Sequence, residues 1–493
     1  MRLDELIPRE LAAAPPLPTA EITALCCDSR AVAPGALFLC VPGFERDGHD
    51  FAGQAVRGGA AALLVERPLH SGVPEVLVRS VRAAMGPVAA RFYGDPSRAL
   101  DVVGITGTNG KTTTAFLVRA LLEAVGVRCG LLGTVKSVIG GRERPVARTT
   151  PEAPDLQGDL RAMLDAGDRA CAMEVSSHAL ALGRTDAVRF AVAVFTNLTQ
   201  DHLDFHVDME DYFQAKRRLF TGGPAPGRCV INIDDPHGRR LAEELPGALT
   251  FSADGDPRAG YSAGEVRCDF DGCRFRLRAP EGERAVHLPM AGRFNVANAL
   301  AALAAVQALG HPLDPLLAAL QEGVRVPGRF EAVDRGQSFA VVVDYAHTPD
   351  SIENVLRAAR ELAGATPNGG RVVCVFGAGG DRDRGKRPQM GEIAARLSEV
   401  VVITSDNPRS EDPERIVEEV LVGARRASRP VGALPLERVV DRRAAIEQAL
   451  SLAHRGDVVV IAGKGHEQGQ ELAGGVKVPF DDVAVARELL GAR

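Results

Sequence analysis

The sequence predicts an α/β protein with three domains. Apolar runs alternate with helical segments through most of the chain, and this alternation indicates parallel sheets with helices on both faces. The length of 493 residues corresponds to about three domains of ordinary size. A glycine-rich loop at 106–113, between a strand-like run and a helix, predicts a central sheet like that of P-loop ATPases.

The first domain is expected to span residues 1–98 and to be a small α/β unit. Its apolar run Ala60–Val65 follows Gly58 and Gly59, which is typical of a buried strand that begins after a turn. The block ends in the turn-forming segment 94–97.

The second domain is expected to span residues 99–328. It opens with the strand-like run Asp101–Thr106 and the amphipathic segment 114–125, and a helix rich in Ala and Leu closes it at Asn295–Leu309. Alternating polarity over Cys268–Arg276 predicts an antiparallel hairpin appended to the central sheet. Further strands are predicted at Ala170–Val175, Ala191–Phe195 and Cys229–Ile233.

The third domain is expected to span residues 329–493. Its apolar runs again alternate with helical segments, which predicts a second parallel α/β unit. These runs are Ala340–Val343, Val372–Phe376, Val400–Thr404 and Val458–Ala462.

Composition and charge exclude several functional classes. The formal net charge of -6 gives no electrostatic basis for binding nucleic acid or a membrane surface. No apolar run reaches the ~18 residues of a membrane span, and the N-terminus has no signal-peptide core. The 9 cysteines form no zinc-type pairs, and their odd number favours reduced thiols. We therefore expect a cytoplasmic protein. We also expect a monomer, which composition and charge do not themselves establish.

The segment Thr106–Thr113 predicts a phosphate-binding loop. Glycines let backbone N–H groups approach phosphate oxygens, and the following helix N-terminus favours negative charge. Lys111 would contact the β- and γ-phosphates of ATP, and Thr112 would reach Mg²⁺. Ile105 stands where the general P-loop pattern has its first glycine, so an ordinary GTPase or motor ATPase is disfavoured.

Many further motifs resemble, in order, those of the Mur ligase family. The resemblance covers nearly the whole chain and is strongest to the members that add the third amino acid to UDP-N-acetylmuramoyl-L-alanyl-D-glutamate. The segments that carry it are 28–30, 107–113, 149–151, 174–178, 197–204, 295–299, 328–330, 344–350, 379–383, 406–409 and 463–467.

The resemblance implies a role for each domain and a two-step reaction. The first domain would bind the UDP moiety, the central domain ATP, and a Rossmann-like C-terminal domain the incoming amino acid. A substrate carboxylate would take the γ-phosphate of ATP, and the amine would then attack the resulting acyl phosphate. Such an enzyme positions anions and neutralises charge, so Mg²⁺ is expected.

Three residues are expected at the catalytic and metal centre in addition to Lys111 and Thr112 of the phosphate loop. Glu174 ends a predicted strand at its carboxyl edge, where α/β sheets place ligands, and the resemblance makes it a metal ligand with His202. By resemblance alone, Lys216 is carbamylated and holds a second Mg²⁺; its local sequence indicates only a basic helix face. His202 and His206 lack a third soft ligand at zinc spacing.

The remaining nucleotide and substrate contacts are also implied by the resemblance. The expected ATP-binding residues are Gly107, Thr108, Asn109, Gly110, Lys111, Thr112, Thr113, Asn295, Asn298, Arg329 and Asp344. The expected contacts to the UDP-sugar dipeptide are Ser29, near the loop 43–48, and Thr149, Thr150, Ser176 and Arg184.

The segment Asp406–Arg409 resembles the motif of the family members that add meso-diaminopimelate, and this resemblance predicts which amino acid is added. meso-Diaminopimelate resembles lysine with an extra carboxylate at its far end, and the fork of Arg409 can pair with that carboxylate. Glu467 would accept from the distal ammonium, Arg382 would bind the other carboxylate, and Gly463 would allow a close backbone approach. The expected set is Arg382, Asp406, Asn407, Pro408, Arg409, Gly463 and Glu467.

Three alternatives remain open at this point. The chain could be a lysine-adding ligase or a folylpolyglutamate synthase, which share the broad family. It could be a P-loop ATPase that hydrolyses ATP without a nucleotide sugar, or a non-catalytic relative. The segments 149–151, 174–178 and 406–409 argue against these readings.

Overall fold

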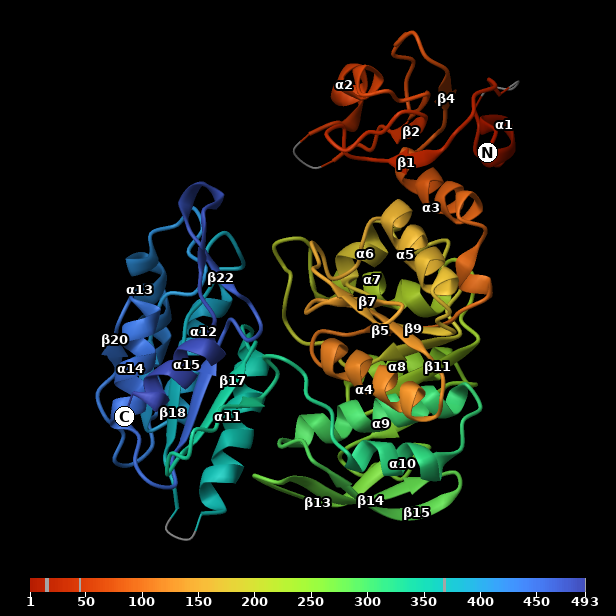
Figure 1. The fold of residues 1–493 in the computed structure, drawn as a ribbon. Helices are drawn as coiled ribbons and strands as arrows, with labels where there is room; N and C mark the ends of the chain where they lie inside the picture. Colours follow the sequence, from red (N-terminus) through yellow and green to blue (C-terminus); the bar gives the residue numbers. More distant parts are fainter. Residues whose placement is uncertain (14–16, 44–45, 367–368, 493) are drawn as a thin grey trace. The chain divides into compact units, whose positions relative to one another are not determined.

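The structure is a computed structural model that describes residues 1–13, 17–43, 46–366 and 369–492 (Figure 1). The chain divides into two compact units. One comprises Met1–Thr106, Gly126–Ala193 and Ala215–Arg228, and the other comprises Gly107–Val125, Val194–Gln214 and Cys229–Arg493. The predicted boundaries after residues 98 and 328 stay predictions. None of the described helices is long and apolar enough to cross a membrane.

The N-terminal segment forms a parallel four-stranded sheet. Its strands pair in chain order, and apolar residues alternate between its faces, so that Leu37 and Leu39 pack with α3 while Phe38 and Leu63 pack with α2. The elements are α1 (Leu3–Leu6), β1 (Ala24–Cys26), β2 (Ala36–Leu39), a 3-10 turn (Gly48–Phe51), α2 (Ala52–Arg57), β3 (Ala62–Val65), β4 (Glu75–Leu77), α3 (Val81–Phe92) and a 3-10 turn (Pro96–Arg98).

The central sheet has eleven strands in the order β15-β14-β13-β12-β11-β10-β5-β9-β6-β7-β8. Its strands are β5 (Asp101–Thr106), β6 (Cys129–Leu132), β7 (Ser137–Ile139), β8 (Arg142–Arg144), β9 (Ala170–Glu174), β10 (Val192–Phe195), β11 (Arg228–Asn232), β12 (Leu249–Ser252), β13 (Tyr261–Asp269), β14 (Gly272–Ala279) and β15 (Gly282–Leu288). The helices are α4 (Lys111–Ala124), α5 (Ala153–Asp165), α6 (Ser177–Ala181), α7 (Met209–Thr221), α8 (Pro236–Glu244), α9 (Arg293–Ala308) and α10 (Leu313–Gln321). The strands predicted from apolar runs in this sheet are confirmed to within one residue at each end, whereas the run Ala60–Val65 of the first domain forms β3 only from Ala62.

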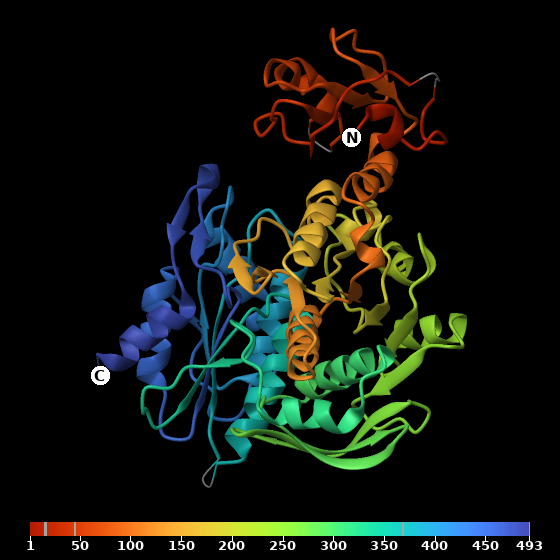
Figure 2. The ribbon, with the colours of Figure 1, turned by 45° about the vertical axis from the view of Figure 1, so that its right-hand side comes forward.

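The predicted hairpin is confirmed, but the expectation of reduced thiols is wrong for two cysteines. Strands β13, β14 and β15 form an antiparallel meander (Figure 2). In its register Cys268 lies opposite Cys273, and the two form a disulfide with Cα atoms 4.0 Å apart. Reasoning from cysteine number and spacing missed this bond, because the pairing depends on strand register. The free cysteines in the described residues are Cys26, Cys27, Cys40, Cys129, Cys171, Cys229 and Cys374.

The C-terminal sheet has the order β16-β17-β21-β18-β19-β20 and is parallel except for β16. Helices α11, α12 and α13 cover one face, while α14 and α15 cover the other, so the predicted doubly wound, Rossmann-like unit is confirmed. The elements are β16 (Glu331–Ala332), β17 (Ala340–Asp344), α11 (Pro349–Gly364), β18 (Val372–Phe376), α12 (Lys386–Leu397), β19 (Val400–Ile403), α13 (Pro413–Ala424), β20 (Glu437–Arg438), α14 (Arg442–Leu452), β21 (Val458–Ala462), β22 (Gly469–Glu471), a 3-10 turn (Ala473–Gly475), β23 (Lys477–Pro479) and α15 (Asp482–Gly491).

Strand order brings the loops after β17, β18, β19 and β21 to one edge of this sheet. The chain passes from β17 to β18, while β21 inserts later between them. Ligands of such sheets bind outside the carboxyl ends of the strands, where the order reverses. All the residues predicted to bind the amino acid lie in the loops 377–385, 404–412 and 463–468.

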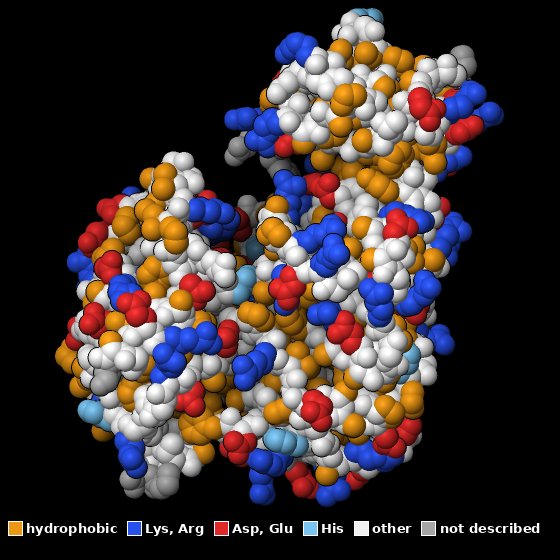
Figure 3. Space-filling view, viewed as in Figure 1, with side chains coloured by type: hydrophobic (Ala, Val, Ile, Leu, Met, Phe, Trp, Pro, Cys, Tyr) orange, Lys and Arg blue, Asp and Glu red, His pale blue; other side chains and the backbone are white. Residues whose placement is uncertain are grey.

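Charged side chains of both signs are interspersed over the visible face of the molecule (Figure 3). This distribution agrees with the modest net charge of -6. Any attraction for an anionic ligand would therefore have to come from local groups.

Candidate active site

The predicted phosphate loop connects β5 to α4 and requires glycine at two positions. Gly107 has a φ of 151°, and a Cβ atom there would lie 1.8 Å from Oγ1 of Thr196. Gly110 precedes α4 with a φ of 84°, and its Cβ would lie 2.3 Å from Oδ1 of Asn298. Both positions combine a backbone conformation that disfavours side chains with a lack of space.

The cationic side chain of this loop folds back onto the loop itself. Nζ of Lys111 donates to the carbonyl oxygens of Gly107, at 2.9 Å, and Thr108, at 2.8 Å. The hydroxyl of Thr112 accepts from Nη2 of Arg329 at 3.1 Å. The structure thus brings Lys111, Thr112 and Arg329 together, as expected for an ATP site, and Thr113 is buried beside them in the first turn of α4.

Two side chains to which the sequence analysis gave no role brace the loop. Asn197 accepts from the backbone N–H of Asn109 at 2.8 Å, and Asp350 accepts from Nδ2 of Asn109 at 2.6 Å. Both residues lie in segments that resemble family motifs, and this resemblance was the only feature of the sequence that could have indicated a role for them. Their partner is far away in sequence, so only the fold reveals the contact.

The predicted ATP contacts Asn295 and Asn298, which the resemblance places near the adenine or its ribose, are buried on α9. Nδ2 of Asn298 donates to Oδ1 of Asn295 at 3.1 Å, and Thr114 on α4 donates to Oδ1 of Asn298 at 3.4 Å. The two amides therefore join α9 to α4 directly behind the phosphate loop, and their contact with adenine stays a prediction.

Asp344 at the end of β17 fixes the backbone around the ATP-binding segment. Its two oxygens accept from the backbone N–H groups of Phe330 and Ala346, both at 2.7 Å. Burial raises the pKa of this carboxyl, although the charge of Arg329 opposes the effect. The guanidinium of Arg329 stacks over the ring of Tyr345, 4.4 Å from its centre. Asp344 therefore helps to position Arg329, because it holds the backbone of the next residue, Phe330.

Glu174 ends β9 with a side chain that is 1% exposed. Oε1 accepts from the backbone N–H of Thr134 at 2.7 Å, and Oε2 accepts from its hydroxyl at 3.1 Å. A Cβ on Gly133 would lie 2.4 Å from Oε1, so glycine gives the carboxylate its room. The carboxylate is held in place at the edge of the sheet that was predicted to bind ligands.

His202 lies in a charged segment of strained backbone. Its φ is 56°, in the left-handed region, and such residues cluster at functional sites. Nε2 of His202 is 3.4 Å from Oδ2 of Asp201, whose Oδ1 is 3.6 Å from Nζ of Lys386. Burial would raise the pKa of Asp201, but the charges of His202, His347 and Lys386 outweigh it and hold the pKa low.

Lys216 lies on α7 and is 1% exposed, so the sequence-based reading of a solvated basic face is wrong at this residue. A fully buried lysine is rare and requires a compensating interaction. His206, the third residue of the apparent zinc pattern, pairs through Nδ1 with Asp211 at 3.1 Å. Among the described residues, no group of three or more His, Cys, Asp or Glu side chains is arranged to hold a metal ion.

The residues expected to bind the dipeptide are brought together around Thr150. Its hydroxyl donates to the backbone oxygen of Glu174 at 2.9 Å and accepts from the backbone N–H of Ser176 at 3.1 Å. Nη1 of Arg184 donates to the backbone oxygen of Thr150 at 3.2 Å. Thr149 joins through its hydroxyl, 3.0 Å from that of Thr134.

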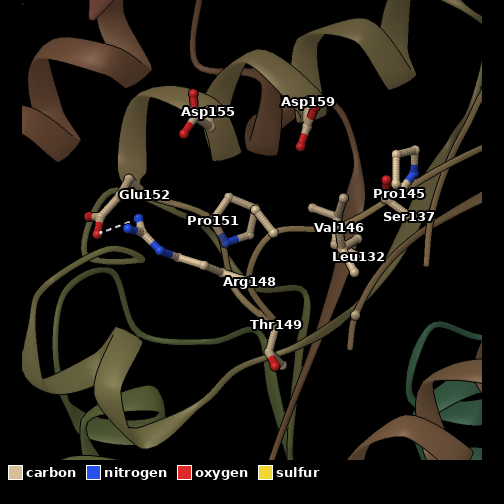
Figure 4. A pocket seen from close by; sticks show the side chains of 12 residues that line it. Leu132, Ser137, Pro145, Val146, Arg148, Thr149, Pro151, Glu152, Asp155 and Asp159 are labelled. Atoms are coloured by element: carbon tan, nitrogen blue, oxygen red, sulfur yellow. Dashed lines mark hydrogen bonds and ion pairs between the residues drawn. The ribbon is translucent and has the colours of Figure 1, made fainter. Parts of the chain in front are cut away.

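An arginine cluster surrounds one carboxylate beside these threonines. Glu152 pairs with Arg184 at 2.9 Å, Arg148 at 3.2 Å and Arg82 at 3.5 Å. The carboxylate of Asp155 also interacts with Arg148 and Glu152, so three cations and two anions leave one net positive charge, which suits an anionic ligand. Arg148 and Glu152 also line a cavity of about 410 Å³ whose wall carries Asp155 and Asp159 (Figure 4).

Ser29 lies in the loop after β1, and its hydroxyl donates to Oε1 of Gln54 on α2 at 3.0 Å. Asp28 and Arg30, on either side, form an ion pair at 2.7 Å. The hydrogen bonds from Arg30 hold the pKa of Asp28 at about 2. In the loop 43–48, which the resemblance also assigned to this pocket, Phe44 and Glu45 lie outside the described residues.

The loop after β19 presents Arg409, whose φ is 51°. Its Nε donates to Oε2 of Glu471 at 2.9 Å, and its Nη1 donates to the backbone oxygen of Gly380 at 2.7 Å. A Cβ on Gly379 would lie 3.2 Å from Nη1 of Arg409 and 3.8 Å from Cγ of Arg382, so the two arginines lie side by side. The side chain of Pro408 is buried behind them.

The other predicted amino-acid contacts divide into two kinds. Asn407 is fully engaged within the protein, since it accepts from buried Lys464 at 2.9 Å and donates to Oε2 of Glu467 at 2.8 Å. Lys464 also donates to that same oxygen at 2.9 Å. By contrast, Oδ2 of Asp406 is buried and has no hydrogen-bond partner among the described residues, and it lies 2.4 Å from the position of a Cβ on Gly463. Buried carboxylate oxygens normally accept a hydrogen bond, so this oxygen is suited to accept one from a ligand.

Comparisons with known proteins agree with this geometry. Family models match three stretches: "Mur ligase family, catalytic domain" at residues 21–93, "Mur ligase middle domain" at 105–306 and "Mur ligase, glutamate ligase domain" at 328–465. A UDP-N-acetylmuramoyl-L-alanyl-D-glutamate–2,6-diaminopimelate ligase of Streptomyces coelicolor is 50% identical over 98% of this chain and 95% of that protein. One of Gloeobacter violaceus is 47% identical over 100% of this chain and 99% of that protein.

Solved structures match in the same way. The structure of a UDP-N-acetylmuramoyl-L-alanyl-D-glutamate–2,6-diaminopimelate ligase aligns with a TM-score of 0.67 and 34% identity, over 96% of this chain and 95% of that one. MurF ligase from Thermotoga maritima in complex with ADP aligns with a TM-score of 0.64 at 20% identity, over 95% and 96% of the two chains, and shares the fold alone. Models, relatives and structures span the same length and agree with one another, and the chain belongs to the Mur ligase family.

Proposed function

We propose that this protein is an ATP-dependent ligase that joins meso-diaminopimelate to UDP-N-acetylmuramoyl-L-alanyl-D-glutamate during peptidoglycan precursor synthesis. One observation carries the choice of amino acid. The loop after β19 offers a buried oxygen on Asp406 that has no hydrogen-bond partner among the described residues, and an arginine fork on Arg409; these suit an ammonium and a carboxylate of the same ligand. The relatives that are 44% to 50% identical and carry this enzyme name support the assignment.

The reaction proceeds through an acyl phosphate. A carboxylate oxygen of the bound dipeptide attacks the γ-phosphorus of ATP, the bond to the β-phosphate oxygen breaks, and ADP leaves. The amine of diaminopimelate then attacks the acyl carbon, loses a proton and expels phosphate, so that one amide forms for each ATP consumed. The contribution of the protein is to hold the reactants in line and to place cations around the transferring group.

The phosphate loop supplies the first of these cations. Nζ of Lys111 exchanges its bonds to the loop carbonyls for bonds to the β- and γ-phosphates, and the N-terminus of α4 faces the same anion. The proposed ATP-binding set is Gly107, Thr108, Asn109, Gly110, Lys111, Thr112, Thr113, Asn295, Asn298, Arg329 and Asp344.

The residues present fit Mg²⁺ better than a metal that needs an all-protein site. Mg²⁺ keeps several waters and is usually bound through one or two carboxylates plus substrate phosphates. The anchored carboxylate of Glu174, the hydroxyl of Thr112 and the imidazole of His202 would hold it. When bound, the ion would neutralise charge that develops on the transferring phosphoryl group.

We include a carbamate on Lys216 in the proposal. Its amine would form a bond from Nζ to the carbon of CO₂ and lose a proton, which turns a cation into a carboxylate-like anion. The support is the burial of Lys216, which disfavours a bare ammonium. The resulting anion would provide a further ligand for Mg²⁺.

The nucleotide-sugar dipeptide is assigned to the threonine and arginine cluster. Thr149, Thr150 and Ser176 offer hydroxyls, Arg184 offers a fork to a carboxylate or phosphate, and Ser29 faces the UDP end. The positive excess around Glu152 supports an anionic ligand here. We further propose that the enzyme works as a cytoplasmic monomer with residues 1–98, 99–328 and 329–493 as its domains.

Diaminopimelate is assigned to the loops of the C-terminal sheet. Asp406 and Glu467 accept from its ammonium groups, while Arg382 and Arg409 bind its carboxylates. Asn407, Pro408 and Gly463 shape the pocket, because Asn407 fixes Glu467 and Gly463 leaves room beside Asp406.

Phosphate release from ATP tests the proposal. The enzyme is given Mg²⁺, ATP and UDP-N-acetylmuramoyl-L-alanyl-D-glutamate, with meso-diaminopimelate or L-lysine in parallel. Release should depend on both the dipeptide and diaminopimelate, with L-lysine nearly inert. A preference for L-lysine would overturn the amino-acid assignment alone, whereas release without the dipeptide would overturn the ligase itself.

A further inference from the structure

The hairpin of β22 and β23 is hydrogen-bonded to the loop that carries Arg409. Glu471, the last residue of β22, makes three bonds to this loop. Its backbone N–H donates to Oδ1 of Asn407 at 2.9 Å, its backbone oxygen accepts from the N–H of Arg409 at 3.1 Å, and its Oε2 accepts from Nε of Arg409 at 2.9 Å. Gln470 adds a bond from Nε2 to the backbone oxygen of Asp406 at 2.6 Å.

The contacts of Arg409 leave one edge of its guanidinium available for a ligand. A guanidinium has five N–H donors in a fixed plane. Nε donates to Glu471 and Nη1 donates once to Gly380, and none of the described residues accepts a hydrogen bond from Nη2. A carboxylate can therefore still bind end-on across Nη1 and Nη2, but the side-on edge through Nε is already used.

We propose that Glu471 is a positioning residue that sets the selectivity for diaminopimelate, an inference that rests on the function proposed above. By holding Nε, Glu471 stops rotation of the guanidinium and presents its outer edge to the distal carboxylate of the substrate. It does not touch the substrate itself. Glu471 also fixes the φ of 51° at Arg409, because its backbone oxygen holds the N–H of that residue.

The chemistry of the two amino acids makes this role measurable. L-Lysine lacks the distal carboxylate, so it gains nothing from an ordered Arg409. Loss of the Glu471 side chain should therefore weaken use of diaminopimelate and leave the low use of L-lysine unchanged. Selectivity, the ratio of the two kcat/KM values, should fall by the same factor.

The variants E471A and E471Q separate positioning from folding. E471A should raise KM for diaminopimelate by about ten-fold, while kcat and the KM values for ATP and the dipeptide stay within about two-fold. E471Q should recover most of this loss, because an amide oxygen can still accept from Nε. E488A is the matched control, because Glu488 on α15 also pairs with an arginine, Arg443 on α14, at 2.6 Å. This variant should have the same kinetics as the enzyme without substitutions.

A double variant decides whether Glu471 acts through Arg409. In an R409A background, E471A should cause no further rise in KM for diaminopimelate. An E471A enzyme with unchanged diaminopimelate KM, beside an R409A enzyme that has lost diaminopimelate use, would overturn this inference and leave the proposed function intact. If the enzyme without any substitution does not use diaminopimelate at all, the proposed function itself is overturned. A parallel rise in all three KM values would show a general structural role and also refute positioning.

Discussion

Replacement of Arg409 by alanine tests the assignment of the distal carboxylate. The substitution removes the Nη1–Nη2 edge, while the protein partners it leaves behind are a backbone oxygen and the half-exposed Glu471, which water can satisfy. Loss of a charge-paired contact of this kind costs about 2 to 5 kcal/mol. The side chain of Arg409 is 21% exposed, so we expect the lower part of that range, about 2 to 3 kcal/mol.

This energy corresponds to a fall of roughly 30- to 150-fold in kcat/KM for diaminopimelate. The assay is phosphate release at varied diaminopimelate, with saturating ATP and dipeptide. The KM for ATP should stay unchanged, and R409K should lie between the two enzymes because it keeps the charge but not the fork. R443A is the control for loss of an exposed arginine. Diaminopimelate kinetics that R409A leaves unchanged would refute the reasoning.

Further predictions concern the phosphate loop and stability. Gly107→Ala should raise KM for ATP at least ten-fold, measured by phosphate release, since its Cβ has no room; an unchanged KM would exclude a tight phosphate loop. Burial raises the pKa of Asp159 to about 6 from 3.8, so the native state binds a proton more tightly than the unfolded chain and loses stability as pH rises through this window. D159N should remove that loss and be more stable by up to about 3 kcal/mol at pH 8 but not at pH 4, in urea unfolding; an equal effect at both pH values would contradict this. Arg442 and Asp482 form an ion pair with both side chains 0% exposed, so R442L should cost about 3 to 5 kcal/mol in the same assay. R443L, at an exposed pair, should lower stability far less, and equal losses would refute the distinction.

Local patterns predicted the fold well. The buried parallel strands of both sheets are short continuous apolar runs, and such runs mark strands directly. The phosphate loop is also local, because strand, glycines and helix follow one another within 101–124. Expectations failed where register or burial decides, as for the disulfide of Cys268 and Cys273 and for the buried side chain of Lys216.

The site was predictable only in part, because its contacts join residues far apart in sequence. The motifs predicted Thr112 and Arg329 as separate residues of the ATP site. The structure shows that they are hydrogen-bonded to each other at 3.1 Å. Asp350 lies in the motif segment 344–350, which did not reveal its bond to Asn109, and Glu471, which supports Arg409, lies outside all of the motif segments. Motifs name the residues that meet ligands, whereas the residues that position them depend on packing.

The most direct test of the central claim follows oxygen atoms through the reaction. UDP-N-acetylmuramoyl-L-alanyl-D-glutamate with ¹⁸O in both carboxylates of its glutamate is incubated with the enzyme, Mg²⁺, ATP and meso-diaminopimelate, and the masses of the products are measured by mass spectrometry. An acyl phosphate requires one labelled oxygen to leave with phosphate as the amide forms. We predict labelled phosphate in equal amount to the new amide of dipeptide and diaminopimelate. Unlabelled phosphate, or ATP hydrolysis without that amide, would contradict the account.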